Sequence, residues 1–252
     1  MIDPTEWHTR FSQQARWTHD LRSYLYQRVN LPQAPNILDV GCGTGALAEE
    51  LIGLSEGAVH GLDINQAHLK IAQSTAPRLQ LTQADAHFLP FPNGTFDLVL
   101  CHFLLLWVSS PLKAILEMKR VSRPGGAILA LAEPDYGGRI DYPPALEQLG
   151  QWQAASLRQQ GADPLMGRKL AQCFHRAGLV QIETGVLGAQ WVAAPSQEEW
   201  QSEWSILAAD LAQNPSWDSK LEQLRGIELA AWQNGTRVLF VPTFYAWGRI
   251  PS

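Results

Sequence analysis

The apolar positions of the chain form short continuous runs, separated by stretches in which they recur at helical spacing. A short continuous run is typical of a strand covered by helices on both faces. Strand and helix patterns alternate from residue 37 to residue 132, which predicts an α/β fold with a doubly wound parallel sheet. The expected strands cover residues 37–40, 58–62, 79–82, 96–102 and 127–132.

Helical patterns flank this alternating region on both sides. A helix is expected from Asp3 to about Val29, with a break near Thr18. Ser196 and Glu199 form a capping-box pair, which predicts a helix start in the second half of the chain. After residue 133 we expect helices to about residue 159, over 163–178, over 196–213 and over 216–235, with strands over 179–187 and 237–245.

The turn Gly41-Cys42-Gly43-Thr44-Gly45 joins the first expected strand to a helix predicted over residues 46–52. Glycine lets the backbone turn tightly and approach a ligand closely, and a helix N-terminus offers unpaired N–H groups to polar ligand atoms. The turn therefore predicts a nucleotide-like ligand. Gly41, Gly43 and Ala46 also fit the dinucleotide pattern G-x-G-x-x-G/A, so the turn alone leaves the ligand open.

Three carboxylates add to this picture. Asp63 follows the second expected strand, where a carboxylate suits a ribose diol. Asp85 lies in the turn after the third strand and could accept a hydrogen bond from an adenine amino group. Asp39 lies inside the apolar first strand, and a buried carboxylate needs donors. Loop N–H groups or a cation are the candidates for Asp39.

Polar residues and glycine stand at the carboxyl ends of the expected parallel strands. In open α/β sheets, ligands bind outside these ends. The sequence therefore predicts one ligand crevice, bordered by Gly41, Asp63, Asp85, His102 and Glu133.

Four segments resemble the class I S-adenosylmethionine-dependent methyltransferases, and within them the "type 11" small-molecule subgroup that includes ubiquinone/menaquinone methyltransferase-like enzymes. They are ILDVGCGTG at 37–45, GLDI at 61–64, QADAHFLPFPNGTFDLVL at 83–100 and KRVSRPGGAILA at 119–130. The resemblance implies a seven-stranded Rossmann-like methyltransferase sheet with N-terminal helices and inserted C-terminal helices, its last strand antiparallel beside the sixth. It also implies a methyltransferase with S-adenosylmethionine as cofactor.

The resemblance suggests one domain over residues 1–252, with an N-terminal helical cap (1–35), a cofactor-binding core (36–133) and substrate-side insertions with the last strands (134–252). No catalytic residue is identified; His102 and Tyr136 are candidates, and Arg10 and Trp17 could contact the cofactor. The expected cofactor-binding residues are Asp39, Gly41, Cys42, Gly43, Gly45, Asp63, Ile64, Asp85, Ala86 and His102.

The second half of the chain points to the methyl acceptor. Most tryptophans lie after residue 150, and inserted helices that carry them could form a lid over an apolar acceptor or could simply pack together. We expect a small, partly apolar acceptor that is methylated on oxygen, nitrogen or carbon. The tryptophans concerned are Trp152, Trp191, Trp200, Trp204, Trp217, Trp232 and Trp247.

The composition of the chain limits the classes of partner that we expect. The net charge is −5 and no dense basic cluster occurs, which argues against nucleic acid. Cys42, Cys101 and Cys173 lack metal-ligand spacing and suit a reducing cytoplasm, so no metal is expected. The N-terminus does not resemble a signal peptide, and the longest apolar stretch, near residues 103–108, is too short to span a membrane. We therefore expect a cytoplasmic protein and leave room for a homodimer.

Two alternatives remain at this point. A nicotinamide-dependent dehydrogenase would use the same glycine turn, but usually nearer the start of its nucleotide domain, and it would not need Asp85 or Pro124-Gly125-Gly126. A protein that binds S-adenosylmethionine without transferring methyl would also fit, because this fold needs no signature catalytic residue. Formation of S-adenosylhomocysteine with a substrate would exclude the second alternative.

Overall fold

The computed structural model describes residues 4–186, 194–211 and 218–252. The described chain divides into two compact units. The first comprises the described parts of residues 1–133, 166–187 and 243–252, and the second those of residues 134–165 and 188–242. The predicted cofactor-binding residues all lie in the first unit.

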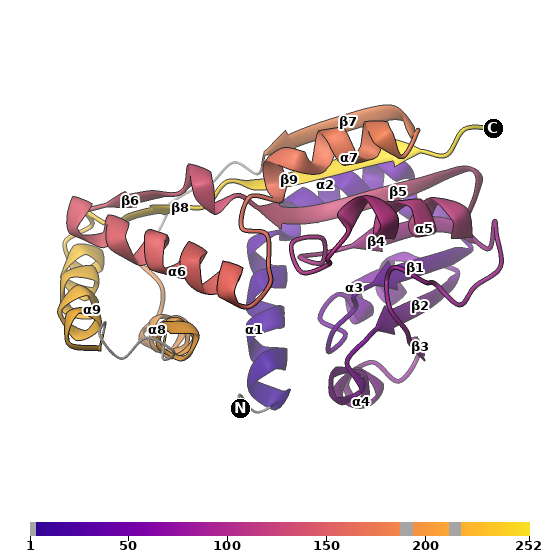
Figure 1. Ribbon diagram of the computed structural model, residues 1–252. Helices are drawn as coiled ribbons and strands as arrows, with labels where there is room; N and C mark the ends of the chain where they lie inside the picture. The colour runs from indigo at the N-terminus through magenta and orange to yellow at the C-terminus, as the bar shows by residue number, and fades with distance from the viewer. Residues whose placement is uncertain (1–3, 187–193, 212–217) are drawn as a thin grey trace. The chain divides into compact units, whose positions relative to one another are not determined.

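The first unit contains a seven-stranded sheet, as the resemblance implied, and its strand order is β3-β2-β1-β4-β5-β9-β7 (Figure 1). Strands β1 to β5 form parallel pairs, and β7 is antiparallel to β9, which lies between β5 and β7. The order reverses at β1 and β4, so the switch point of the sheet lies beside the glycine turn. The strands are β1 Asn36–Val40, β2 Ala58–Asp63, β3 Gln80–Gln83, β4 Phe96–Cys101, β5 Ser122–Pro134, β7 Val180–Val186 and β9 Thr243–Arg249.

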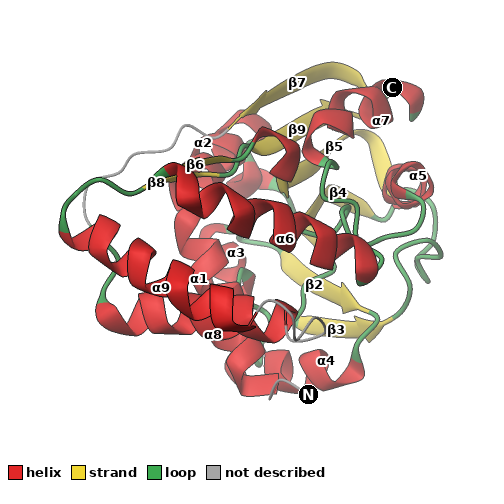
Figure 2. Cartoon of the chain, turned by 60° about the vertical axis from the view of Figure 1, so that its left-hand side comes forward, coloured by secondary structure: helices red, strands yellow, loops and turns green. Residues whose placement is uncertain are grey.

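Helices cover both faces of this sheet, with α5 and α7 on one face and α2 and α3 on the other (Figure 2). Every residue of β4 is buried, which explains its continuous apolar run. Asn65 caps α4 as predicted, because its side chain accepts hydrogen bonds from the N–H groups of Ala67 and His68. The helices of this unit are α1 Pro4–Trp17, α2 His19–Val29, α3 Ala48–Leu54, α4 Gln66–Thr75, α5 Pro111–Val121 and α7 Leu170–Arg176, with 3-10 turns at Leu31–Gln33 and Gly167–Lys169.

The helical break predicted near Thr18 separates α1 from α2. Arg22 of α2 is almost fully buried, and its guanidinium pairs through two nitrogens with the Glu50 carboxylate of α3. His8 of α1 bonds to the Thr44 hydroxyl of the glycine turn at 2.9 Å. Both N-terminal helices are thus tied by polar contacts to the segment after β1.

The second unit combines the antiparallel strands β6 Ile140–Tyr142 and β8 Val238–Phe240 with three helices, α6 Glu147–Gln159, α8 Gln197–Leu211 and α9 Asp218–Gln233. Short 3-10 turns lie at Tyr136–Gly138 and Pro144–Leu146. The predicted capping box opens α8: Ser196 N–H donates to the Glu199 carboxylate, and Glu199 N–H donates to the Ser196 hydroxyl. Trp152, Trp200 and Trp204 pack in the core of this unit.

Several predicted boundaries were wrong. The strand expected over 237–245 is two strands, β8 and β9, which belong to different sheets. Asp163 and Pro164 precede no helix start; the Asp163 carboxylate instead accepts the Leu165 N–H, and α7 begins only at Leu170. β5 is longer than predicted, and β6 was missed. The expectations for Asp3, Trp191, Ser216 and Trp217 lie outside the described residues.

Within the described residues, no helix is long and apolar enough to cross a membrane. The same residues hold no cluster of three or more His, Cys, Asp or Glu suited to a metal ion.

Candidate functional site

The glycine turn after β1 folds back onto the end of β2. The N–H groups of Gly41 and Cys42 both donate to the Leu62 carbonyl, at 2.7 and 3.0 Å. Gly41 and Gly43 have φ angles of +77° and +54°, a left-handed conformation that disfavours any side chain. The glycines predicted from sequence are therefore required by the turn itself.

Asp63 joins this turn to the start of α4. One carboxylate oxygen accepts the Gly43 N–H at 2.9 Å, and the other accepts the Asn65 N–H at 2.8 Å. A carboxylate oxygen offers two lone pairs, so each still has one for a further donor. Asp63 can thus hold the turn and accept bonds from both hydroxyls of a diol.

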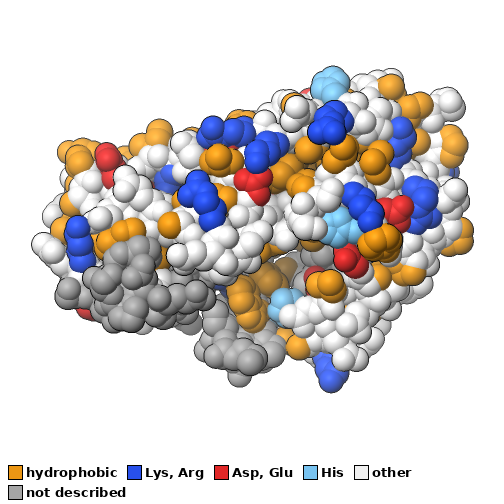
Figure 3. Space-filling view, viewed as in Figure 1, with side chains coloured by type: hydrophobic (Ala, Val, Ile, Leu, Met, Phe, Trp, Pro, Cys, Tyr) orange, Lys and Arg blue, Asp and Glu red, His pale blue; other side chains and the backbone are white. Residues whose placement is uncertain are grey.

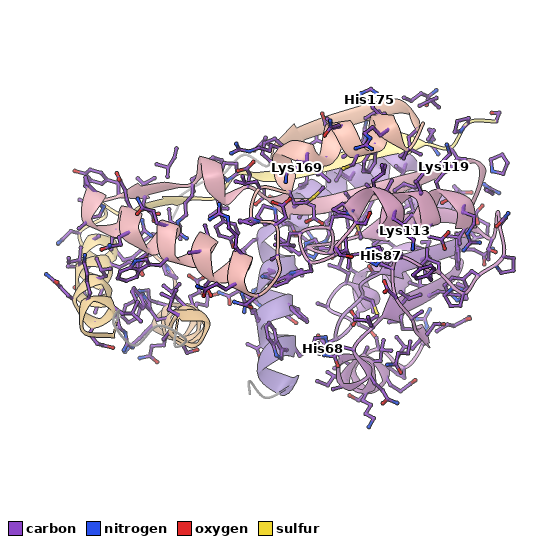
Figure 4. All side chains as sticks on the ribbon, viewed as in Figure 1. His68, His87, Lys113, Lys119, Lys169 and His175 are labelled. Carbon is purple, nitrogen blue, oxygen red and sulfur yellow. The ribbon has the colours of Figure 1, made fainter. Side chains whose placement is uncertain are left out.

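Aromatic rings from α1 lie against the turn. A side-chain carbon at Gly43 would stand 3.0 Å from the Phe11 ring. Phe11 also meets Trp7 and His68, with ring centroids 5.4 and 5.5 Å apart. Figure 4 shows His68 on α4. The turn therefore faces aromatic rings from α1, which in turn contact His68 of α4.

Asp85 follows β3 and is held by a residue two positions on. Its Oδ1 accepts from the His87 N–H at 2.8 Å and bonds to the His87 ring Nδ1 at 2.7 Å. These bonds, with the backbone bond first, keep the pKa of Asp85 below its usual value. Asp85 is thus an ionised acceptor at the end of β3.

Asp39 is buried in β1, and its Oδ1 has no hydrogen-bond partner among the described residues. Burial, with the nearby charge of Asp63, raises the pKa of Asp39 to about 7, although Arg22 lowers it. The donors predicted for Asp39 are therefore absent at Oδ1. The cation that favours its charge is Arg22, which acts through space.

His102 follows β4, and its Nε2 lies 2.9 Å from the Thr18 hydroxyl. That hydroxyl also accepts a hydrogen bond from Arg22 at 2.6 Å. Burial, with the charge of Arg22, lowers the pKa of His102 to about 3. His102 is therefore neutral at physiological pH, and α1 and α2 hold one of its nitrogens.

The other predicted residues fall into three groups. Ile64 is 66% exposed beside Asp63, so its side chain is open to a ligand, whereas Ala86 is buried. Gly45 and Cys42 serve the turn: the Gly45 N–H donates to the Cys42 carbonyl, and the Cys42 thiol is buried with a raised pKa. Contact between Cys42 and a ligand stays a prediction, and the buried thiol would make that contact by packing only.

Two further candidates have other surroundings. Glu133 is buried, and its carboxylate accepts N–H bonds from Leu104, Leu105 and Leu106, so it orders the loop after β4 instead of bordering a crevice. Tyr136 belongs to the second unit, where its N–H donates to the Pro164 carbonyl. Its catalytic role stays a prediction.

The weaker candidates lie on the N-terminal helices. Arg10 lies over the Trp7 ring, 5.1 Å from its centroid. Trp17 is 56% exposed and lines a pocket of about 530 Å³ with residues that include Arg16 and Ala46. None of the predicted cofactor-binding residues lines this pocket.

Sequence reasoning missed three residues of this site. Phe11 lies in the helical segment expected from Asp3 to about Val29 but was not singled out, nor was His87, and Arg22 reads as an ordinary surface charge. The sequence does carry one usable signal: His87 stands two residues after Asp85, a spacing at which a side chain can bond to the preceding carboxylate.

Together, the first unit places a tight glycine turn, an acceptor pair on Asp63 and an ionised Asp85 at the ends of β1, β2 and β3. A ribose, an adenine amino group and a ligand chain passing over the turn match these three features. The arrangement can therefore bind and orient a nucleoside.

Comparisons with known proteins agree with this chemistry. A family model described as "Methyltransferase domain" matches residues 38–130. A demethylmenaquinone methyltransferase of Bacillus licheniformis is 31% identical over 191 residues, which cover 69% of this chain and 81% of that protein. The ubiquinone/menaquinone biosynthesis C-methyltransferase UbiE of Coxiella burnetii is 37% identical over 124 residues, 46% of this chain and 48% of that protein.

Structural comparison extends the likeness to the whole fold. A SAM-dependent methyltransferase from Aquifex aeolicus matches with a TM-score of 0.58 at 16% identity, covering 99% of this chain and 100% of that one. At this identity the match shows the fold alone.

Proposed function

Because the chain belongs to the class I S-adenosylmethionine-dependent methyltransferases, we propose that it methylates a small, partly apolar molecule, and that the ends of β1 to β4 hold the cofactor. The observation that carries the cofactor site is the meeting of the glycine turn, Asp63 and Asp85 at one edge of the sheet. Membership of this family favours methyl transfer over both alternatives, the nicotinamide-dependent dehydrogenase and the protein that binds S-adenosylmethionine without transferring methyl.

The residues at this edge fit the cofactor. Asp63 keeps one lone pair on each oxygen for a ribose hydroxyl, and the exposed Ile64 offers an apolar side chain for the adenine face. Asp85 offers an ionised oxygen to the adenine amino group. When bound, S-adenosylmethionine supplies an activated methyl group on a positively charged sulfur.

His102 is the titratable residue best suited to act near the acceptor. Its neutral ring keeps Nδ1 for one hydrogen bond to the acceptor, because only Nε2 is used in the contact with Thr18. We assign it a role in orienting the acceptor, because a ring with a pKa of about 3 is a poor base at neutral pH. Orientation alone can supply about 7–11 kcal/mol in favourable intramolecular cases, so a dedicated base is not required.

The acceptor class follows from the relatives. Two of them are methyltransferases named for menaquinone or ubiquinone, whose rings carry apolar chains. We therefore propose a ring-containing, partly apolar acceptor and place its recognition in residues 134–242. We also place the enzyme in the cytoplasm, where its free cysteines Cys42, Cys101 and Cys173 would stay reduced.

A panel of acceptors tests the function. The purified chain would be incubated with S-adenosylmethionine and hydroquinones, phenols, amines or small carboxylic acids, and S-adenosylhomocysteine would be measured. We expect turnover with aromatic acceptors that carry apolar substituents. Turnover only with small, fully polar amines or acids would contradict the proposed acceptor class while leaving the methyltransferase activity intact.

Replacement of Asp63 tests the ribose contact. Asp63→Ala should weaken binding of S-adenosylmethionine by about 2–3 kcal/mol, because it removes charge-assisted hydrogen bonds to the ribose and releases Gly43 N–H. Titration calorimetry measures the change.

Asn65→Ala is the matched control. It removes the N-cap of α4, and thus about 1 kcal/mol of stability, but leaves the proposed ribose contacts in place. Equal loss of affinity in both variants would mean that Asp63 acts through α4 and not through the ribose.

A further inference from the structure

The two oxygens of the Asp85 carboxylate have different surroundings. Oδ1 receives both bonds from His87, one from the backbone N–H at 2.8 Å and one from the ring at 2.7 Å. No hydrogen bond reaches Oδ2 from the described residues, and the Asp85 side chain is 44% exposed. The carboxylate is therefore held in place through Oδ1, and Oδ2 remains available to accept a hydrogen bond from a ligand.

The hydrogen bonds of His87 define its tautomer. Its Nε2 accepts the backbone N–H of Ser110 at 3.2 Å, and a backbone N–H can only donate, so Nε2 carries no proton. The proton of the neutral ring is then on Nδ1, from which it is donated to Asp85. The His87 side chain is only 12% exposed, so both contacts are shielded from competing water.

His87 connects two segments at the carboxyl edge of the sheet. Ser110 immediately precedes α5, and Asp85 follows β3, so the ring links the segment after β4 to the segment after β3. Figure 4 shows His87 next to Lys113 of α5, and Figure 3 shows histidine, basic, acidic and apolar side chains gathered over this start of α5. Lys113 favours the charged form of Asp85 and lies over the Phe88 ring.

We propose that His87 is a positioning residue that aims the free oxygen of Asp85 at the exocyclic amino group of the cofactor's adenine, and thereby sets specificity for adenine. The proposal rests on the adenine contact assigned to Asp85 above. A terminal carboxylate torsion is broad, so a single bond from the His87 backbone leaves the plane of the carboxylate free to turn. The second bond, from the ring, fixes that plane.

Two substitutions separate the halves of the His87 ring. The side-chain amide of Asn places an N–H donor near the position of Nδ1, whereas that of Gln places an acceptor oxygen near the position of Nε2. His87→Asn therefore keeps a donor for Asp85 and loses the acceptor for Ser110. His87→Gln keeps the acceptor for Ser110 and loses the donor for Asp85.

The readout is discrimination between two ligands. Calorimetry would compare S-adenosylhomocysteine with its analogue in which hydrogen replaces the 6-amino group, in the wild type, His87→Gln, His87→Asn and Asp85→Ala. A hydrogen bond to a charged group predicts that the wild type prefers the amino compound about ten- to a hundredfold. We expect this ratio to fall below about threefold in His87→Gln and Asp85→Ala and to stay near the wild-type value in His87→Asn.

Each of the other outcomes would contradict one part of this proposal. A ratio that falls in Asp85→Ala but not in His87→Gln would refute the role of His87 and leave the adenine contact standing. A ratio unchanged in Asp85→Ala would refute the adenine contact itself. Equal loss of affinity for both ligands in His87→Gln, with the ratio preserved, would mean that His87 only stabilises the loop. A ratio that falls as far in His87→Asn as in His87→Gln would exclude Nδ1 as the positioning donor.

Discussion

Valine at position 43 is expected to abolish cofactor binding while the sheet stays folded. The backbone of Gly43 is left-handed, and a side-chain carbon there would stand 3.0 Å from the Phe11 ring. A β-branched residue adds further atoms to that contact and strains the backbone. Both effects displace the Gly43 N–H from Asp63, so the turn and the proposed ribose acceptor are disturbed together. Calorimetry should show no measurable binding of S-adenosylmethionine to Gly43→Val.

Gly125→Val is the matched control for backbone strain. Gly125 also has a left-handed φ, +73°, but a side-chain carbon there would meet no atom within 4 Å. We expect the two variants to lose similar stability from strain, while only Gly43→Val loses the cofactor. Near-normal affinity in a folded Gly43→Val protein would contradict the assignment of this turn to the cofactor.

The parts of the site that could be predicted from sequence are those governed by the local backbone. The turn needs glycine at positions with positive φ, and Asp63 must be the last residue of β2 to meet the Gly43 N–H. Strand β4 is covered on both faces, which leaves a continuous apolar run in the sequence. Each of these signals lies within a few residues of the feature that it specifies.

Features that depend on distant contacts could not be predicted in this way. Phe11 meets Gly43 because α1 packs across the turn. The buried guanidinium of Arg22 pairs with Glu50 of α3 and also donates to Thr18 and the Ala15 carbonyl. β6 and β8 are three residues long and pair across almost a hundred positions of the chain, so β6 was missed and β8 was not separated from β9 in the strand predicted over 237–245.

The second unit is built around a buried ionic network. Arg237 has a fully buried side chain and donates to Asp141 at 2.7 Å and to Glu228 at 2.9 Å. Arg139 pairs with the other oxygen of Asp141 at 2.6 Å. Trp200 and Trp204 donate their indole N–H groups to Glu228. The network therefore connects β6, β8, α8 and α9, the elements to which we assign acceptor recognition.

Arg237→Met is expected to loosen this unit and to separate cofactor binding from methyl transfer. Removing one member of a buried ion pair leaves uncompensated charge and costs about 3–5 kcal/mol. Here Asp141 loses one of its two arginine partners, and Glu228 loses its arginine while it keeps the indole donors of Trp200 and Trp204. The residues assigned to the cofactor lie in the other unit, which has its own core. We expect affinity for S-adenosylmethionine to stay within about threefold of the wild type, while turnover with the acceptor is lost.

Arg158→Met provides the control, because Arg158 is an exposed arginine on α6 of the same unit. A surface change of this kind typically alters stability by no more than about 0.5 kcal/mol, so its turnover should match the wild type. Thermal unfolding of both variants, followed alongside calorimetry and the S-adenosylhomocysteine assay, separates the effects. Full turnover in an Arg237→Met protein with a clearly lowered unfolding temperature would show that methylation of the acceptor does not depend on an ordered second unit. Loss of cofactor binding together with turnover would contradict the assignment of the cofactor to the first unit alone.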